Sequence, residues 1–328
     1  MGVRTLLPAP HDFVDPRTGA PAFGSYAGPL PAVRLGLDRV ARLLRRKKWL
    51  YVALSSDELW VALAVVRTGY ASTAFAFVLD HATKELVADV RAMGPSKAAE
   101  VADDPRLVGV VTRFGGGRSR VVVRREGEAW EVRARLGDLA IEATLDAARA
   151  PPAISAIASL DGGLRSATEK RALMAATGTV DVGRDRRRLE GLGGYDYTQG
   201  EMPRRTRWRW AFALGRTPGG EPVGFNVVSG FVGEPECAAF VGDRVLPLGE
   251  PRITFEPGHP DRPWRVEGEG IEATFVPSAV HRQSTNLVLV RSRFLQPVGR
   301  FDGVLRAGGR EIRLDQVPGV VEDQDVVW

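Results

Sequence analysis

The sequence predicts an all-β protein built from two consecutive antiparallel β-barrels. Its 37 glycines and 22 prolines are spread along 328 residues, which fits many short strands joined by turns better than long helices. Runs rich in β-branched and aromatic residues recur along the whole chain. The order of these runs in the first half returns in the second half. A duplicated unit of antiparallel strands accounts for all three observations.

The repeat consists of three matched pairs of segments that keep the same order and similar separations in both halves. The paired segments begin at Lys47 and Thr206, at Ala74 and Ala238, and at Trp130 and Trp264. In the last pair the tetrapeptide IEAT is identical. Each unit carries enough strands to close into a barrel, which removes the exposed edges of an open sheet. We therefore predict two tandem antiparallel barrels of lipocalin-like type.

The chain before the first barrel divides into an arm and a short helix. Residues 1–31 are rich in proline and glycine and predict an irregular N-terminal arm. From Val33 to Lys48, apolar residues recur at helical spacing and predict a short amphipathic helix. Its C-terminal end carries the basic sequence RRKK, which we interpret as a solvated helix end in preference to a phosphate-binding patch.

The remaining boundaries follow from the strand-like runs. These runs continue from Trp49 to Ala147, and we assign residues 32–160 to the first barrel. Residues 161–192 are predicted to form a linker with a short helix around Thr168 to Ala176. Residues 193–328 form the second barrel. The glycine-rich sequence RFGGGRSR within the first barrel is interpreted as a hairpin turn because no lysine followed by serine or threonine comes after it.

The composition is that of a folded globular protein with a small basic excess. Hydrophobic residues make up 44% and charged residues 26% of the chain. The formal net charge is +5, but the charges alternate in sign, so we interpret the excess as arginine-rich surface and expect no nucleic-acid partner. No stretch approaches the roughly 20 apolar residues of a membrane span. We expect a cytoplasmic protein, for which peripheral membrane contact remains open.

No metal site and no cofactor is predicted. Cys237 is the only cysteine, which excludes an internal disulfide, and we interpret it as a small core residue. The histidines show neither HxH nor HxxxH spacing. They are His11, His81, His259 and His281. The acidic side chains near the C-terminus resemble a metal cluster, but the solvated start of a strand is the simpler interpretation. These are Glu322, Asp323 and Asp325.

The segment from Gly193 to Trp210 is the strongest candidate for a functional site. It combines titratable side chains with flat aromatic surface and has no helical or strand period before Thr206, which suits the lip of a pocket. A partly desolvated Asp196 can act as a general base or, when protonated, as an acid, and Tyr197 can stabilise developing charge. The alternative is that Asp196 only caps a tight turn.

The candidate ligand contacts come from both halves of the chain. Trp208 and Trp210 share one face of a predicted strand, although aromatic pairs at strand starts are more often core than ligand platform. Glu236 points either into a cavity or into water, and His281 is expected at a barrel mouth. The complete set of predicted ligand contacts is Trp208, Trp210, Asn226, Glu236, His281 and Tyr70.

Several motifs resemble a known family. EKRALMAATGTVDVG, GYDYTQGEMPRRTRWRWAFALG, GFNVVSGFVGEPE, FLQPVGRFDG and EDQDVVW look like the bacterial family called domain of unknown function 2804. The chain is more distantly similar to the two-barrel, calycin-like group that includes carotenoid hydratases, tocopherol cyclases and cyclising enzymes of polyketide pathways. This resemblance implies a pocket in or between barrels and catalysis by an acid or base. The hydratases have a histidine where this chain has Tyr197.

These observations lead to three hypotheses. The first is an enzyme that needs no cofactor and hydrates, isomerises or cyclises a hydrophobic molecule, such as an isoprenoid, lipid or polyketide, by proton transfer through Asp196. The second is a lipocalin-like carrier that binds such a molecule unchanged. The third is an interaction module with filled barrels. A cavity that contains Asp196 favours the first hypothesis. The sequence does not determine the oligomeric state.

Overall fold

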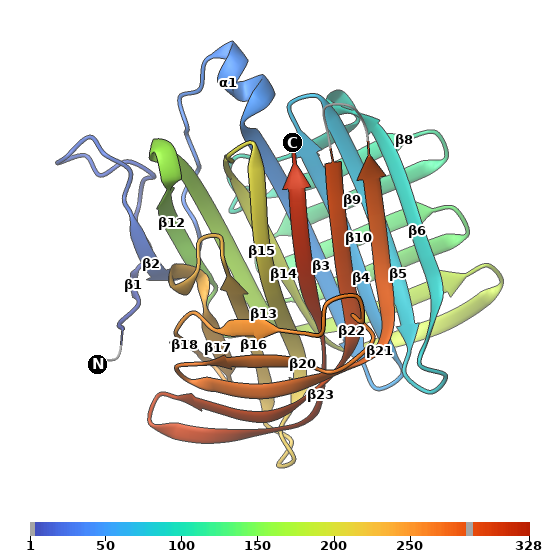
Figure 1. The fold of residues 1–328 in the computed structure, drawn as a ribbon. Helices are drawn as coiled ribbons and strands as arrows, with labels where there is room; N and C mark the ends of the chain where they lie inside the picture. Colours follow the sequence, from blue (N-terminus) through green and yellow to red (C-terminus); the bar gives the residue numbers. More distant parts are fainter. Residues whose placement is uncertain (1–3, 287–290) are drawn as a thin grey trace.

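The computed structural model describes residues 4–286 and 291–328, which form two curled antiparallel β-sheets (Figure 1). The first sheet has 14 strands, and only the short β1–β2 pair in it is parallel. Its strands are β1 (Leu7–Pro8), β2 (Gly24–Ala27), β3 (Arg46–Ser56), β4 (Leu59–Thr68), β5 (Ala71–Asp80), β6 (Glu85–Pro95), β7 (Ala99–Val101), β8 (Gly109–Gly116), β9 (Ser119–Glu126), β10 (Ala129–Leu136), β11 (Leu139–Asp146), β12 (Ile154–Leu160), β13 (Leu164–Val182) and β14 (Asp185–Glu201).

The second sheet has nine strands, all of which pair in antiparallel fashion. Its strands are β15 (Arg205–Arg216), β16 (Pro222–Ser229), β17 (Ala238–Val241), β18 (Arg244–Pro247), β19 (Arg252–Thr254), β20 (Trp264–Gly268), β21 (Ile271–Asn286), β22 (Arg291–Ala307) and β23 (Arg310–Val327). The described helices are short. They are α1 (Arg39–Leu44) and the 3₁₀ turns η1 (Ser96–Ala98), η2 (Asp161–Gly163) and η3 (Glu234–Glu236).

Both sheets have the same topology, as the repeat in the sequence predicts. In each sheet, four consecutive strands form one side, and the last strand of the unit returns to pair with the first. In the first sheet β14 pairs with β3, and in the second β23 pairs with β15. The three matched segments fall on β3 and β15, on β5–β6 and β17–β18, and on β10–β11 and β20–β21. The predicted all-β class with tandem barrels is confirmed.

The predicted linker is wrong, because residues 161–192 contain most of two long strands. β13 pairs with β11, β12 and β14, and β14 connects it to β3 in the centre of the first sheet. The expected helix at Thr168–Ala176 lies within β13. Its sequence contains good helix formers, but strands on both sides satisfy its backbone hydrogen bonds, and this tertiary context overrides local propensity. Residues 193–201 likewise belong to the first sheet.

The N-terminal segments agree with the prediction in kind but differ in extent. The described part of the arm is irregular apart from the short strands β1 and β2. α1 covers six residues of the segment expected as helix, with the carboxylate of Asp38 accepting hydrogen bonds from the amides of Val40 and Ala41 at its start. It ends where Arg46 begins β3. None of the described helices has the length and hydropathy needed to cross a membrane.

The core has two parts that meet at β3. Leu50, Val52 and Leu54 point into the first barrel, whose interior is filled by apolar side chains. Tyr51 and Ala53 point the other way and pack with residues of the second sheet. Alternate residues of a strand face opposite sides of a sheet, so β3 is buried on both faces and reads as an almost continuous apolar run. The second sheet therefore packs against the outside of the first barrel.

Candidate active site

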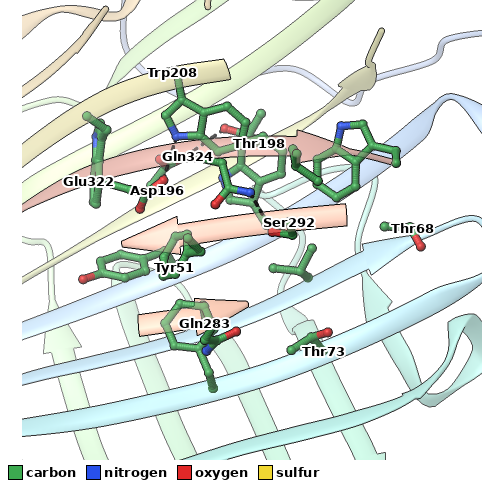
Figure 2. Close-up of a pocket in the computed structure, with 18 of the residues that line it drawn as sticks. Tyr51, Thr68, Thr73, Asp196, Thr198, Trp208, Gln283, Ser292, Glu322 and Gln324 are labelled. Atoms are coloured by element: carbon green, nitrogen blue, oxygen red, sulfur yellow. Dashed lines mark hydrogen bonds between the residues drawn. The ribbon is translucent and has the colours of Figure 1, made fainter. Parts of the chain in front are cut away.

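A pocket of about 200 Å³ lies between the two sheets (Figure 2). Strands β3 to β6, β13 and β14 supply one wall, and β15, β16 and β21 to β23 supply much of the other. Its surface is mostly apolar, with aromatic rings from both sheets. Tyr70 and Met93 are partly exposed at one end, whereas Lys170 and Glu322 are buried. The pocket therefore leads from solvent to buried titratable groups.

Asp196 projects into this pocket from β14, between Tyr51 on β3 and Lys170 on β13. Its Oδ2 atom lies 2.5 Å from Nζ of Lys170, and its Oδ1 accepts a hydrogen bond of 2.9 Å from the hydroxyl of Thr198. The same ammonium group lies 3.1 Å from Oε2 of Glu236. Lys170 therefore forms ion pairs with both acidic side chains at once.

The pKa values of the neighbouring groups reflect this network. Burial acts to lower the pKa of Lys170, but the charges of Asp196 and Glu236 outweigh it, and the pKa is raised above its ordinary value. Burial raises the pKa of Glu236, and Lys170 opposes that rise. Lys170 is therefore a permanent cation at neutral pH, and it holds both acidic side chains at the buried end of the pocket.

Glu322 projects into the pocket from β23 and has no cationic partner in direct contact among the described residues. Its Oε1 accepts a hydrogen bond of 2.7 Å from Nε1 of Trp208, and its Oε2 accepts one of 2.8 Å from Nε2 of Gln296. Burial raises its pKa to about 8; these hydrogen bonds oppose the rise and the charge of Asp196 adds to it. The carboxyl group is therefore protonated at neutral pH.

Asp196 and Glu322 occupy equivalent places in the two repeated units. Asp196 is paired across its ladder with Tyr51, and Glu322 is paired with Trp210, the residue that matches Tyr51 in the repeat. The two carboxyl groups thus enter one pocket from corresponding strands of two sheets (Figure 2). One forms an ion pair with a lysine, and the other is a neutral acid beside a glutamine. Such a pair can accept and donate protons in the same reaction.

Aromatic rings from both repeats stack across the pocket. Trp49 and Trp208, which match in the repeat, stack with their ring centroids 6.0 Å apart and an interplanar angle of 10°. Tyr51 and Trp210 make an edge-to-face contact with centroids 5.2 Å apart. Tyr51 is buried and its pKa is well above the ordinary value, chiefly because of burial, so it stays a neutral phenol. These rings offer apolar and π surface to a ligand beside the two acids.

The structure brings five of the eight predicted site residues to the pocket. They are Asp196, Trp208, Trp210, Glu236 and Tyr70. Asn226 lies behind the wall, where it accepts a hydrogen bond of 2.6 Å from Nε1 of Trp210 and donates one of 2.8 Å to the carbonyl of Glu236. His281 is buried, stacks on Phe75 and is 2.7 Å from Asp89. Both support lining residues without facing the pocket themselves.

Tyr197 does not line the pocket, contrary to the prediction. It follows Asp196 in a strand, so its side chain points to the opposite face, into the filled first barrel. Its hydroxyl donates a hydrogen bond of 2.6 Å to the carbonyl of Ala102 and accepts one of 2.7 Å from Nε2 of Gln199. The geometry therefore gives Tyr197 a structural position, and Tyr51 is the phenol that reaches the pocket.

Lys170 and Glu322 were the residues that sequence reasoning missed. Lys170 lies in the segment interpreted as a linker, and Glu322 was interpreted as part of a solvated strand start. The available signal for Glu322 is the strand periodicity of EDQDVVW, in which alternate residues share a face. Glu322 and Gln324 lie on the face that lines the pocket, and Asp323 and Asp325 alternate with them in the sequence. The latter two point to the other face of the strand and pair with arginines on neighbouring strands. The expectation for Cys237 is confirmed, because it is fully buried.

The fold and pocket define a two-barrel protein of a kind found in other solved structures. A protein assigned as AttH from Nitrosomonas europaea is similar with a TM-score of 0.51, at 14% identity over 90% of this chain and 98% of that one. Kievitone hydratase from Nectria haematococca is similar with a TM-score of 0.50, at 13% identity over 98% of each chain. At these identities the likeness establishes a shared fold.

The sequence itself places the chain in a family. Domain of unknown function (DUF2804) matches residues 8–328, so the protein belongs to this family, as its motifs predicted. Among curated proteins, none matches the chain.

Proposed function

We propose that this protein is an enzyme that moves protons on a hydrophobic small molecule, with hydration of a carbon–carbon double bond as the leading reaction. The observation that carries the proposal is the pair of carboxyl groups inside one mostly apolar pocket, one ion-paired with a lysine and the other without a cationic partner among the described residues. Asp196 is paired with Lys170, and Glu322 has a pKa raised to about 8 by burial. An acid and a base are thus both supplied by the chain, and the proposal invokes no cofactor.

In the proposed reaction, Glu322 donates its proton to one carbon of the double bond. The cation that forms on the other carbon lies beside the faces of Trp208 and Trp210, which are suited to stabilise positive charge. A water molecule attacks this carbon, and Asp196 accepts the proton that the water loses. Exchange with solvent then returns a proton to Glu322 and removes one from Asp196, so the enzyme is regenerated. Without the water step, the same groups would support isomerisation or cyclisation.

The buried charges favour an enzyme over a carrier. A protein that only stores a hydrophobic molecule needs apolar walls, whereas burying Lys170, Asp196, Glu236 and Glu322 costs desolvation energy that apolar residues would avoid. Perturbed titratable groups clustered in a cleft are typical of catalytic sites. The fold that this chain shares with kievitone hydratase also favours an enzyme over a carrier. The filled interior of the first barrel does not weaken the proposal, because the pocket lies outside it.

The test begins with native mass spectrometry of protein purified from its host, which identifies the class of any hydrophobic molecule that remains bound. Incubation of that molecule, or of its dehydrated form, with enzyme in oxygen-18 water measures hydration directly. In deuterium oxide, exchange without oxygen incorporation would indicate isomerisation or cyclisation. We expect Asp196→Asn and Glu322→Gln each to lower kcat by about 10²- to 10⁴-fold.

The matched control is Asp325→Asn, which removes a carboxylate from the outer face of the same strand as Glu322. Its kcat should equal that of the wild type. Binding of the ligand with no exchange of oxygen or hydrogen would identify a carrier. Unchanged kcat in both Asp196→Asn and Glu322→Gln would show that the acid and base are assigned wrongly.

A further inference from the structure

α1 exposes an apolar face that no other part of the described chain covers. Val40, Leu43 and Leu44 are 65%, 48% and 54% exposed, and the helix has no buried residue. The three positions have the spacing of one helical face. A surface helix of a globular protein normally turns such a face toward the core. Here the helix stands at the margin of the fold, away from both cores (Figure 1).

The other face of α1 is basic. Arg39, Arg42 and Arg45 are exposed; Arg42 and Arg45 lie opposite to the three aliphatic side chains, and Arg39 lies at the edge of their face. Across residues 4–286 and 291–328, none of these guanidinium groups forms an ion pair with a carboxylate. A short helix with aliphatic residues on one face and unpaired arginines on the other matches the surface of an anionic membrane in both respects.

The helix is fixed beside the exposed end of the pocket. A Cβ atom on Gly69 would lie 2.0 Å from the carbonyl oxygen of Leu43, so the last turn of α1 rests directly on the turn between β4 and β5. Nζ of Lys47 donates a hydrogen bond of 2.7 Å to the carbonyl of Leu44. The same ammonium group lies 5.7 Å from the ring centroid of Tyr70 and 5.3 Å from that of Trp328, both of which line the pocket.

We infer that α1 is a docking element for the surface of a membrane that contains anionic lipids, and that it places the open end of the pocket against that surface. A hydrophobic ligand could then pass between the bilayer and the pocket with little exposure to water. The reason for this placement rests on the proposed function, whereas the docking surface itself does not. Tyr70 and Met93, which are exposed at the same end of the pocket, extend the apolar surface.

Vesicle co-sedimentation tests this inference without any assay of catalysis. The full chain is mixed at low ionic strength with vesicles of phosphatidylcholine alone, or of equal parts phosphatidylcholine and phosphatidylglycerol. We expect binding to the anionic vesicles, weaker binding to the neutral ones, and loss of binding as salt is raised. The double variant Leu43→Asp/Leu44→Asp should bind anionic vesicles at least about tenfold more weakly, because it removes two of the three inserting side chains.

Two matched controls separate the helix from the rest of the surface. Val276→Asp makes a similar change at an exposed aliphatic residue of β21. Arg118→Glu/Arg120→Glu makes the same change of charge as Arg39→Glu/Arg42→Glu, but in the β8–β9 hairpin. Only the α1 variants should lose binding. Because every substituted side chain is exposed, the thermal unfolding of all variants should stay close to that of the wild type.

The inference is overturned if the wild type does not bind anionic vesicles, or if Leu43→Asp/Leu44→Asp binds them as tightly as Val276→Asp does. Sedimentation without vesicles adds a third outcome. If the wild type self-associates and the leucine variant does not, while neither binds vesicles, then a second copy covers the helix and the membrane assignment is wrong. Vesicle binding combined with no exchange of oxygen or hydrogen on the ligand would support the docking surface and contradict the proposed enzyme.

Discussion

The two halves of this protein share one topology but surround their equivalent carboxyl groups with different partners. In the first half, the neighbour of Asp196 is Lys170, whose ammonium group forms a buried ion pair with it. In the second half, the neighbour of Glu322 is Gln296, which offers a hydrogen bond but no charge. Burial then raises the pKa of Glu322 to about 8. The cation beside one carboxyl group and the neutral amide beside the other thus give the two equivalent groups different chemical environments.

The halves also differ in what they enclose. The interior of the first barrel is filled, and its outer face along β3 to β5 becomes a wall of the pocket. The second sheet turns apolar and aromatic side chains toward that wall. The pocket therefore depends on both halves being present, because each supplies one of the two carboxyl groups. Duplication accounts for both the matching tryptophans and the matching acids.

The largest expected effect comes from removing the partner that distinguishes the two halves. Lys170→Met leaves Asp196 and Glu236 buried without a cation, so we expect the free energy of unfolding at neutral pH to fall by about 3–5 kcal/mol. Gln296→Met, the matched change beside Glu322, removes the hydrogen bond to Glu322 and the long one from Tyr51, both with neutral groups, and should cost only about 1–2 kcal/mol. Urea denaturation measures both. Equal losses in the two variants would show that the cation beside Asp196 matters no more than the amide beside Glu322.

A second prediction concerns the pH dependence of stability. The ordinary pKa of a glutamate is 4.5, and that of Glu322 is about 8 in the folded state, so between these values only the folded protein holds this proton. Its contribution to stability is therefore complete below about pH 4.5 and is lost as pH rises toward 8, with a slope of at most about 1.4 kcal/mol per pH unit.

Glu322→Gln should remove this contribution, and Asp325→Asn should leave it. Since other buried acids also titrate, the informative quantity is the difference between the unfolding free energies of wild type and variant, measured from pH 5 to pH 9 by urea denaturation at each pH. A difference that does not change across this range would show that Glu322 ionises normally. Enzymatic turnover should likewise decline above about pH 8, where Glu322 has lost the proton it must donate.

The sequence predicts the fold of this protein better than it predicts the site. The repeat locates strands in both halves because alternation and turn residues are local signals, and the matched segments do fall on equivalent strands. β13 escaped prediction because TEKRALMAA has the composition of a helix, and only its partners β12 and β14 make it a strand. Because Lys170 lies in this strand, the sequence does not predict it as a site residue either.

Which side chains reach the site depends on which face of each strand they occupy. The sequence does not give these faces for segments that it does not predict as strands. The chemistry of its side chain alone singles out Asp196, because the segment around it shows neither helical nor strand periodicity and is interpreted as the lip of a pocket. Once that segment is a strand, Asp196 and Tyr197 must face opposite sides. The same rule separates Glu322 from Asp323. The sequence does not show how the second sheet packs on the first barrel. This packing brings Tyr51 and Glu322 to the same pocket.

The smallest expected effect tests this division of faces directly, using two tyrosines that lie one residue pair apart across the β3–β14 ladder. Tyr197→Phe removes the hydroxyl that donates to the carbonyl of Ala102 and accepts from the amide of Gln199, so we expect a loss of about 1–2 kcal/mol in the free energy of unfolding and no change in kcat. Tyr51→Phe removes a phenol from the pocket whose hydrogen bond to Gln296 is long at 3.4 Å. Because this phenol lines the pocket, we expect Tyr51→Phe to lower kcat. Because its hydrogen bond is long, we expect the free energy of unfolding to change by less than about 1 kcal/mol. Urea denaturation and turnover of the identified ligand measure the two quantities on the same samples. If Tyr197→Phe lowers kcat and Tyr51→Phe does not, the chemistry takes place inside the first barrel and not between the sheets.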